Sequence, residues 1–341
     1  MSTTDHPIAV TMGDPAGVGP IIACQAYEQV RRKGGRPFYV VAPMQALSEG
    51  AGRAWYLSGG AMRGIDDPAQ AAELFGSGLP VLHFEGRAAR AGHPDPATAP
   101  TIIDSIRLAV EHVRVGKAAA VVTNPIAKAL LYRAGFKHPG HTEFLAELAA
   151  DGGKPPRPVM MLVGGGLRVA LVTIHKPLAA VIPSLTTDLI AETGRIVQAA
   201  LKRDFGIAAP RIGLCGVNPH AGEDGEIGRE EIEIVNPAAE RLRAEGVDIS
   251  DARPGDTIFH EARHGRWDAV IAMYHDQGLI PVKTLDMWCG VNVTLGLPFI
   301  RTSPDHGVAY DAAASGNANA DSLIAALDLA DQMARARAAT S

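Results

Sequence analysis

The chain is poor in cysteine and has no long apolar run. Its three cysteines, Cys24, Cys215 and Cys289, are odd in number and far apart, which excludes a disulfide framework and indicates reduced thiols in a cytoplasmic protein. No window reaches the roughly 18–20 apolar residues of a membrane span. The first ten residues, MSTTDHPIAV, lack the basic segment and apolar run of a secretory signal. We therefore expect a cytoplasmic protein without a membrane partner.

The chain also has no large excess of basic or acidic residues. The 32 basic and 37 acidic residues give a net charge of −5, and no long basic stripe occurs, so nucleic acid is not an expected partner. Apolar residues make up 47% of the chain, which excludes disorder throughout. At about 150 residues per domain, 341 residues correspond to about two domains. Because no linker is visible, we expect residues 1–341 to form a single two-lobed catalytic unit, whose internal boundary the sequence does not place.

Short runs rich in Val and Ile alternate with amphipathic stretches. This alternation predicts a largely parallel sheet covered by helices. Gly164-Gly165-Gly166 stands between two apolar runs and predicts a hairpin, so part of the sheet is expected to be antiparallel. The expected strands are 8–11, 38–42, 81–84, 118–123, 159–163, 167–173, 212–217, 269–273 and 291–295, and the expected helices include 101–115, 187–204, 229–245 and 321–339.

Three histidines, His175, His220 and His275, stand at or just after the ends of predicted strands. Ligands of open α/β sheets bind outside the carboxyl ends of strands, and three neutral imidazoles make a divalent-metal site with open positions for water or substrate. Asp276 and Glu223 could orient the ligand rings. The alternative is that these are ordinary loop histidines, because a chain with twelve histidines places some after strands by chance.

Two groups of residues suit an anionic ligand. Thr142, before an expected helix over 144–149, is predicted to cap that helix, where His141 and Thr142 would add donors for a phosphate or carboxylate. Lys283, Asn292 and Arg301 follow at intervals of nine residues and together suggest an anion clamp. Capping alone, or isolated surface charges and a structural amide, would explain the same residues.

A glycine-rich turn, Gly13–Pro20, lies between a predicted strand and a predicted helix. Its spacing is neither GxGxxG nor that of a P-loop, so no Rossmann nucleotide site is indicated. A tight strand–helix turn and a direct contact to an anion both remain open for this segment.

Six segments together resemble, in order, the motifs of the 4-hydroxythreonine-4-phosphate dehydrogenases, and the similarity runs from about Ile8 to Ala330. The resemblance implies an isocitrate/isopropylmalate-dehydrogenase-like α/β fold, with two lobes around a central mixed sheet and an active cleft between them. It also implies a homodimer with the active site at the subunit interface, and NAD or NADP as cofactor without a Rossmann fingerprint. The segments are Gly13–Pro20, Thr123–Pro125, Gly140–Phe144, Asn218–Glu223, Tyr274–Gly278 and Gly290–Gly307.

The same resemblance implies roles for individual residues. It assigns one divalent ion per subunit, zinc, magnesium or cobalt, to His175, His220 and His275, whereas the residues that contact the nicotinamide are not assigned. Asp256 matches a polar position near the substrate, and Lys283 is expected to act as a proton shuttle or a phosphate ligand. The implied substrate-binding residues are His141, Thr142, Lys283, Asn292 and Arg301.

The implied reaction is the NAD(P)-linked oxidation of 4-phosphooxy-L-threonine in pyridoxine 5′-phosphate biosynthesis, followed by decarboxylation. Ile21 stands where the family has an acidic residue, and 286–289 and 310–314 are also atypical. These departures leave open a related dehydrogenase that acts on erythronate or threonate 4-phosphate or on an aromatic cis-dihydrodiol. A hydrolase or aldolase with a three-histidine metal site, and a non-catalytic binding protein, are the alternatives from other classes.

Overall fold

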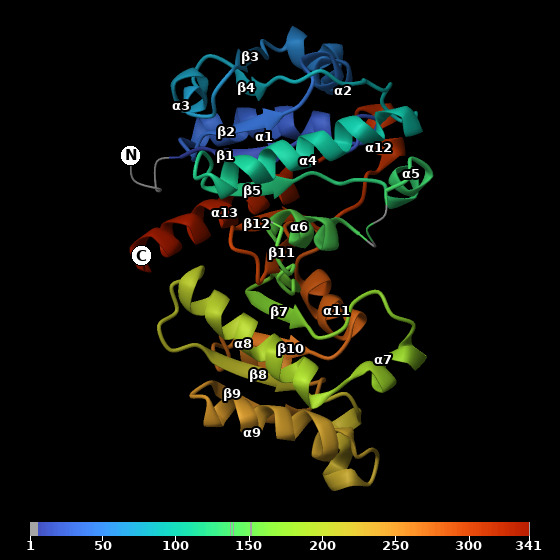
Figure 1. Ribbon diagram of the computed structural model, residues 1–341, viewed down its shortest axis with the longest axis vertical. Helices are drawn as coiled ribbons and strands as arrows, with labels where there is room; N and C mark the ends of the chain where they lie inside the picture. Colours follow the sequence, from blue (N-terminus) through green and yellow to red (C-terminus); the bar gives the residue numbers. More distant parts are fainter. Residues whose placement is uncertain (1–5, 137, 139, 151, 341) are drawn as a thin grey trace. The chain divides into compact units, whose positions relative to one another are not determined.

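The computed structural model describes residues 6–136, 138, 140–150 and 152–340 (Figure 1). The chain divides into two compact units. Unit 1 combines the described residues up to Pro158 with Leu297–Ala338, and unit 2 is formed mainly by Val159–Gly296. Each unit contains both strands and helices, which confirms the predicted α/β class. In the described part of the chain, no helix combines the length and hydropathy of a membrane span.

Unit 1 contains six strands in parallel register. Five of them are buried along their whole length, and four of these five, including β1, are largely apolar. Strands that are covered on both faces read as continuous apolar runs, which is why the sequence revealed most of them. The strand order is β3 (Met62–Ile65), β4 (Leu79–Leu82), β2 (Phe38–Val41), β1 (Ile8–Thr11), β5 (Ala120–Thr123) and β12 (Arg301–Pro304).

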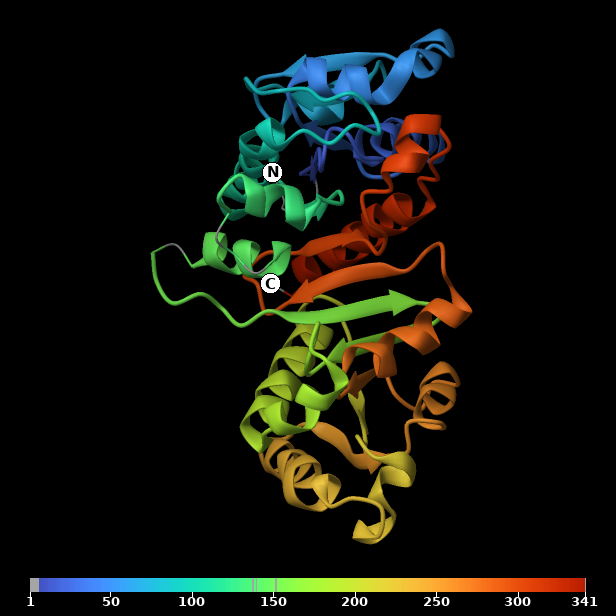
Figure 2. The same ribbon diagram turned by 90° about the vertical axis from the view of Figure 1, so that its right-hand side faces the viewer.

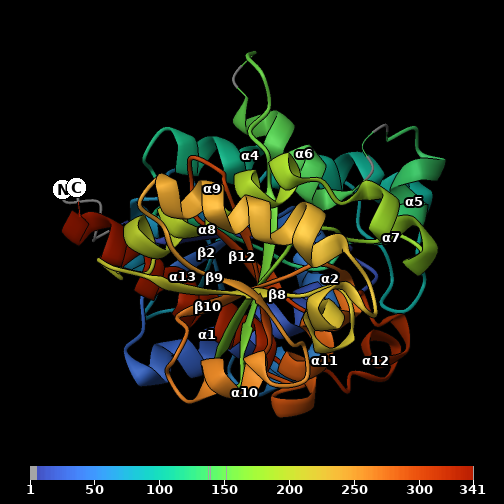
Figure 3. The same cartoon turned by 90° about the horizontal axis from the view of Figure 1, so that it is seen from below.

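Helices lie on both faces of this part of the sheet, with α4 and α1 on opposite sides (Figures 1 and 3). On α4, Ile102, Ile106 and Ala109 are fully buried at helical spacing, and with Leu145 of α6 they form a core against the strands. The helices of unit 1 are α1 (Gly19–Lys33), α2 (Met44–Leu57), α3 (Gln70–Leu74), α4 (Ala99–Arg114), α5 (Lys128–Arg133), α6 (His141–Ala149), α12 (Tyr310–Ser315) and α13 (Asp321–Thr340).

Unit 2 contains the antiparallel pairs. β6 pairs antiparallel with β7 and with β11, and Figure 2 shows β6 and β11 as two long neighbouring arrows. The hairpin predicted at Gly164–Gly166 joins β6 to β7, so the mixed sheet is confirmed. The strand order is β11 (Val291–Leu295), β6 (Val159–Gly164), β7 (Leu167–Leu171), β10 (Ala269–Ala272), β8 (Arg211–Cys215) and β9 (Asp248–Arg253).

Two layers of helices enclose the strands of unit 2. Figure 3 shows α8 and α9 on one side and α10 and α11 on the other. Phe259 of α10 and Leu279 of α11 belong to one core cluster with Val169 and Val270. The helices are α7 (Leu178–Ser184), α8 (Thr187–Arg203), α9 (Asn236–Ala244), α10 (Ile258–Arg263) and α11 (His275–Leu285), and a π-helical turn, Glu231–Val235, precedes α9.

Three strands were not predicted. The exposed residues of β3 and β9 give their segments no continuous apolar run. β12 reads Arg-Thr-Ser-Pro and is nevertheless completely buried. Burial of a polar strand depends on partners elsewhere in the chain, so composition could not have indicated it.

Candidate functional site

The three predicted metal ligands follow three neighbouring parallel strands of unit 2. His175 comes after β7, His275 after β10 and His220 after β8, and β10 pairs in parallel with both of the others. Asp256 follows β9, which is the next parallel strand. Because parallel strands present their carboxyl ends at one edge, all four side chains belong to the same edge of the sheet.

His175 and His275 are brought together. Their ring centroids are 5.5 Å apart, and both line a cavity of about 380 Å³ with Thr173, Lys176 and Tyr274. Asp276 contacts the ring of His275, with 2.7 Å between Oδ1 and Nδ1, as the sequence predicted. A carboxylate on Nδ1 fixes the ring and leaves Nε2 available for a ligand.

His220 lines an adjoining cavity of about 460 Å³ together with Asp256 and Gln277. Tyr274 and Asp276 line both cavities, so the cavity of His175 and His275 and the cavity of His220 share part of their lining. His175 and His220 also have positive φ, 48° and 52°, which is rare for residues other than glycine and is typical of functional sites.

This donor set suits a divalent metal. Neutral imidazoles bind zinc and related ions, two of the rings are adjacent, and Asp276 orients one of them. Over the described residues, no three His, Cys, Asp or Glu side chains are already grouped as ligands of one ion. The three-histidine metal site therefore stays a prediction.

The segment that carries His220 has a strained backbone and is fixed by hydrogen bonds to a buried side chain. Five successive residues, His220–Asp224, have positive φ. The side chain of Glu231 is buried and accepts hydrogen bonds from the backbone N–H groups of Val217 and Asn218, at 2.7 and 2.8 Å. Its Oε2 accepts a third from Asn218 Nδ2 at 2.9 Å. Glu231 thus positions the turn that presents His220.

Lys283 and Asn292 lie farther along the chain of unit 2. Lys283 is on α11, eight residues after His275, which is about 12 Å along a helix axis. Asn292 is on β11, opposite Leu162 of β6. Its Oδ1 is buried without a hydrogen-bond partner, and a buried polar atom of this kind calls for a ligand or water.

In unit 1, Arg301 begins β12 beside β5, and only 4% of it is exposed. Its Nε and Nη2 donate to Thr123 Oγ1 at 3.1 and 2.7 Å. Burial lowers the pKa of the guanidinium to about 10, so it is still a cation at neutral pH. A buried, oriented cation of this kind suits an anionic group.

His141 lies in the field of that cation. Burial, the charge of Arg301 and the charge of Lys128 together lower its pKa well below the usual value. The Nε2 atom of His141 is buried and has no hydrogen-bond partner. The side chains of Lys128 and Glu143 approach the backbone at Gly140. His141, Lys128 and Arg301 therefore form an electropositive group at the start of α6.

Thr142 does not cap α6, contrary to the prediction. The helix begins at His141, three residues earlier than expected, and Gly140 occupies the N-cap position. Thr142 is the second helical residue, where its backbone N–H is one of the free donors of the first turn. Pro139, two residues before the start of this helix, lies outside the described residues.

The glycine-rich turn is closed by contacts within unit 1. Asp14 is buried and accepts hydrogen bonds from the N–H of Ala16 and from the hydroxyl of Tyr310, at 2.9 and 2.6 Å. A Cβ atom on Gly19 would lie 2.3 Å from the carbonyl oxygen of Met12. These contacts support the tight-turn interpretation of the sequence.

Sequence reasoning missed Lys128 and Glu231. Nothing near Lys128 distinguishes it from a surface lysine. Glu231 did carry a signal, since it stands four residues before the buried Val235 and seven before the buried Ala238, on the core-facing side of the expected helix. An acidic residue at such a position needs buried partners.

Comparisons with known proteins agree with these observations. The model of the family described as "Pyridoxal phosphate biosynthetic protein PdxA" matches residues 35–330. The chain is 51% identical over 340 residues to the 4-hydroxythreonine-4-phosphate dehydrogenase of Bradyrhizobium diazoefficiens, covering 97% of this chain and 98% of that relative.

Solved structures show the same similarity. The 4-hydroxythreonine-4-phosphate dehydrogenase of Klebsiella pneumoniae superposes with a TM-score of 0.84 at 36% identity, over 96% of this chain and 99% of that one. A terephthalate 1,2-cis-dihydrodiol dehydrogenase from Burkholderia xenovorans superposes with a TM-score of 0.65 at 27% identity, over 96% and 98% of the two chains.

Proposed function

This chain belongs to the PdxA family of pyridoxal phosphate biosynthetic proteins, and from that premise we propose that it oxidises 4-phosphooxy-L-threonine to 2-amino-3-oxo-4-phosphooxybutanoate. This β-keto acid then loses CO2 to give 3-amino-2-oxopropyl phosphate for pyridoxine 5′-phosphate synthesis. The observation that carries the proposal is the sheet edge that gathers His175, His220, His275 and Asp256 in a chain whose relatives match over nearly its whole length.

In this proposal the whole chain is one catalytic unit, and two copies form a homodimer with the active site at the subunit interface. His175, His220 and His275 hold one divalent ion, zinc, magnesium or cobalt. When bound, that ion supplies a Lewis acid and NAD or NADP supplies the hydride acceptor. Asp276 keeps the ring of His275 oriented, and Glu231 keeps the His220 turn in place.

Four residues are assigned to the polar and anionic groups of the substrate. Arg301 offers a buried cation, and His141 offers the unpartnered Nε2. Thr142 adds a hydroxyl and a backbone donor in the first turn of α6. Asn292 supplies an amide whose Oδ1 is unpartnered and can accept a hydrogen bond from the substrate ammonium.

Proton transfer falls to Lys283 and Asp256. The oxidation removes the proton of the C3 hydroxyl as hydride leaves C3, so a base must lie within reach. Asp256 lines the cavity of His220 and is suited to accept that proton, whereas Lys283 shuttles a proton or binds the phosphate. Decarboxylation leaves an enolate that must then be protonated, which a protonated Lys283 can do.

The test is a coupled assay that follows reduced nicotinamide with 4-phosphooxy-L-threonine and either NAD+ or NADP+, before and after chelation. We expect turnover that EDTA abolishes and that added zinc, magnesium or cobalt restores. Loss of a group that only orients a metal ligand costs about 10–100-fold in metal affinity or activity. His220 is proposed as a ligand itself, so His220→Ala should lower turnover by at least about a hundredfold. His93→Ala, which removes an exposed histidine of unit 1, is the matched control and should leave turnover unchanged.

The similarity to a cis-dihydrodiol dehydrogenase favours one second candidate, the oxidation of an aromatic cis-dihydrodiol. That substrate carries no phosphate, so the same assay with a dihydrodiol separates the two. Turnover of the dihydrodiol without turnover of 4-phosphooxy-L-threonine would replace the first proposal. Parallel reactions with erythronate 4-phosphate and threonate 4-phosphate test the remaining related substrates. Reaction of any substrate without nicotinamide reduction would point to a hydrolase or aldolase instead.

A further inference from the structure

Helix α10 of unit 2 contains His260, and its C-cap residue is His264, four positions later. The segment reads His260-Glu261-Ala262-Arg263-His264, which matches the compact H-E-x-x-H pattern of helical metal sites. The backbone N–H of His264 donates to the carbonyl of His260 at 3.1 Å, so the helical spacing is kept through the last residue of the pattern. Residues four apart on a helix lie on the same side.

The two imidazoles are close enough to share an ion. Their ring centroids are 4.1 Å apart with an angle of 37° between the rings. Two nitrogens bound to one zinc ion at about 2.0–2.1 Å each lie no more than about 4.2 Å apart. Small rotations about the side-chain bonds of exposed residues therefore suffice to bring one nitrogen from each ring to a common ion.

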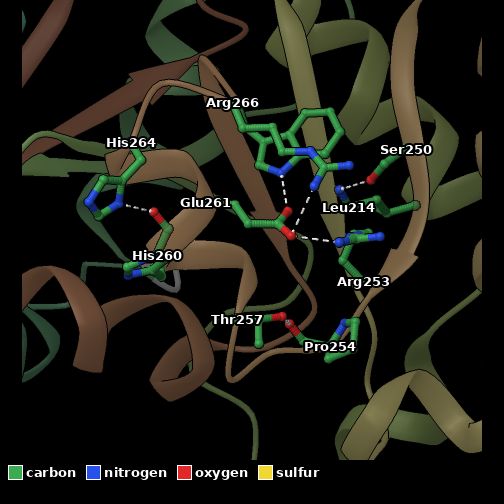
Figure 4. A network of polar contacts seen from close by, with 10 residues as sticks. Leu214, Ser250, Arg253, Pro254, Thr257, His260, Glu261, His264 and Arg266 are labelled. Carbon is green, nitrogen blue, oxygen red and sulfur yellow. Dashed lines mark hydrogen bonds and ion pairs between the residues drawn. The ribbon is translucent and has the colours of Figure 1, made fainter.

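One of the rings is already oriented. Nδ1 of His264 lies 2.8 Å from the carbonyl oxygen of His260, the contact drawn in Figure 4. A carbonyl only accepts hydrogen bonds, so in the neutral ring this contact selects the tautomer with the proton on Nδ1 and the lone pair on Nε2. A backbone carbonyl on the other nitrogen is the arrangement that metal-binding histidines commonly show.

We propose that His260 and His264 form a bidentate site for a divalent transition-metal ion such as Zn²⁺, Ni²⁺ or Cu²⁺. Both side chains are exposed, so hydrated ions reach them directly. Neither residue belongs to the linings of the two cavities that contain His175, His220 and His275. The site is therefore distinct from the one that the proposed oxidation requires.

The site binds metal without hydrolytic chemistry. In hydrolases with this pattern the glutamate acts as the general base. Here the carboxylate of Glu261 accepts hydrogen bonds from Trp267 Nε1 at 2.9 Å and Arg266 Nη1 at 3.1 Å, and it also pairs with Arg253. Figure 4 shows this carboxylate directed toward the two arginines and away from both imidazoles.

Solvent completes the coordination shell of the ion. Among the described residues no third His, Cys, Asp or Glu completes a group of ligands, so water fills the other coordination positions. Nitrogen sites of this kind favour Cu²⁺ over Ni²⁺ and Zn²⁺.

Calorimetric titration of metal-stripped protein with Ni²⁺ tests the site, with binding stoichiometry and affinity as the readouts. The His260→Ala/His264→Ala variant should lose one Ni²⁺ per chain. The His175→Ala/His275→Ala variant should keep that ion, whether or not the proposed dehydrogenase site binds one of its own. Each single variant, His260→Ala or His264→Ala, should bind this Ni²⁺ at least about tenfold more weakly, because one tethered ligand raises the effective concentration of the other.

Glu261→Gln and His93→Ala are the controls, and both should keep the Ni²⁺ affinity of the wild type. Circular dichroism and thermal midpoints establish that each variant is folded; the two exposed histidines are not expected to be needed for folding. Unchanged Ni²⁺ stoichiometry and affinity in the His260→Ala/His264→Ala variant would overturn the proposal. So would a loss of this ion in Glu261→Gln, because it would place the carboxylate among the ligands.

Discussion

Removal of the Glu231 carboxyl should release the turn that presents His220. Glu231→Ala leaves the N–H groups of Val217 and Asn218 without their acceptor. An unsatisfied buried donor costs about 1–3 kcal/mol. Because Val217 and Asn218 are half-buried, the low end applies, and the two donors together cost about 2–3 kcal/mol in the free energy of unfolding. Four of the five residues in His220–Asp224 are not glycine, and each left-handed residue costs roughly 1–2 kcal/mol. The freed turn should therefore relax.

Glu231→Gln is the graded comparison. Its remaining oxygen can still accept from both backbone N–H groups, but its amide nitrogen meets the Nδ2 donor of Asn218 in place of an acceptor. We expect a loss of about 1–2 kcal/mol, equivalent to about one hydrogen bond. Glu233→Ala removes an exposed neighbour that pairs with Arg229 and should change stability by less than about 0.5 kcal/mol.

Urea unfolding measures these free energies, and amide hydrogen exchange at residues 217 and 218 reports the turn directly. Faster exchange there in Glu231→Ala, together with turnover that falls as far as in His220→Ala, is the expected result. The reasoning is refuted if Glu231→Ala loses less than about 1 kcal/mol and exchanges these two amides at the wild-type rate.

Three further predictions concern other parts of the chain. Tyr310→Phe removes the hydroxyl that donates to buried Asp14 and should cost about 1–3 kcal/mol in urea unfolding; a loss below about 0.5 kcal/mol would contradict this. Because the pKa of His141 is lowered by burial and by its cationic neighbours, the unfolded chain binds a proton below about pH 6.5 that the folded chain does not. Stability should then fall on acidification by up to about 1.4 kcal/mol per pH unit, and His141→Asn should reduce that slope; equal slopes in urea unfolding at several pH values would rule this out. Ellman's reagent should titrate one fast thiol in the folded protein, the exposed Cys289, because Cys215 is buried and burial raises its pKa to about 12; a second fast thiol would refute this.

Most of the buried strands could be predicted from the local sequence pattern alone. β1 and β10 are short apolar runs covered on both faces, and the sequence predicted them within a residue. The histidines after β7, β10 and β8 could be identified as a group because each follows such a run. The order β7-β10-β8, by which they come to one edge, could not be read from the chain.

Polar residues with distant partners mark the limit of prediction. Arg301 was selected as an anion ligand, but its burial against Thr123, 178 residues earlier in the chain, appears only in the fold. Thr142 was wrongly predicted as the N-cap residue. Helix α6 begins at His141, and its N-cap position is occupied by Gly140, which has no side chain. For Arg301 the deciding contact lies far outside any local window, whereas for Thr142 the error lay in the position of the helix start.

The sequence by itself determined the α/β class, most of the buried strands and the hairpin at Gly164–Gly166, and it supplied the candidate residues for metal and anion binding. These follow from hydrophobic periodicity and side-chain chemistry, which are local properties. Only the tertiary structure decided that His175 and His275 lie ring to ring, that Glu231 lies beneath the His220 turn and that Glu261 faces away from its neighbouring histidines. Such relations depend on packing between segments far apart in the chain, where buried polar groups must find partners.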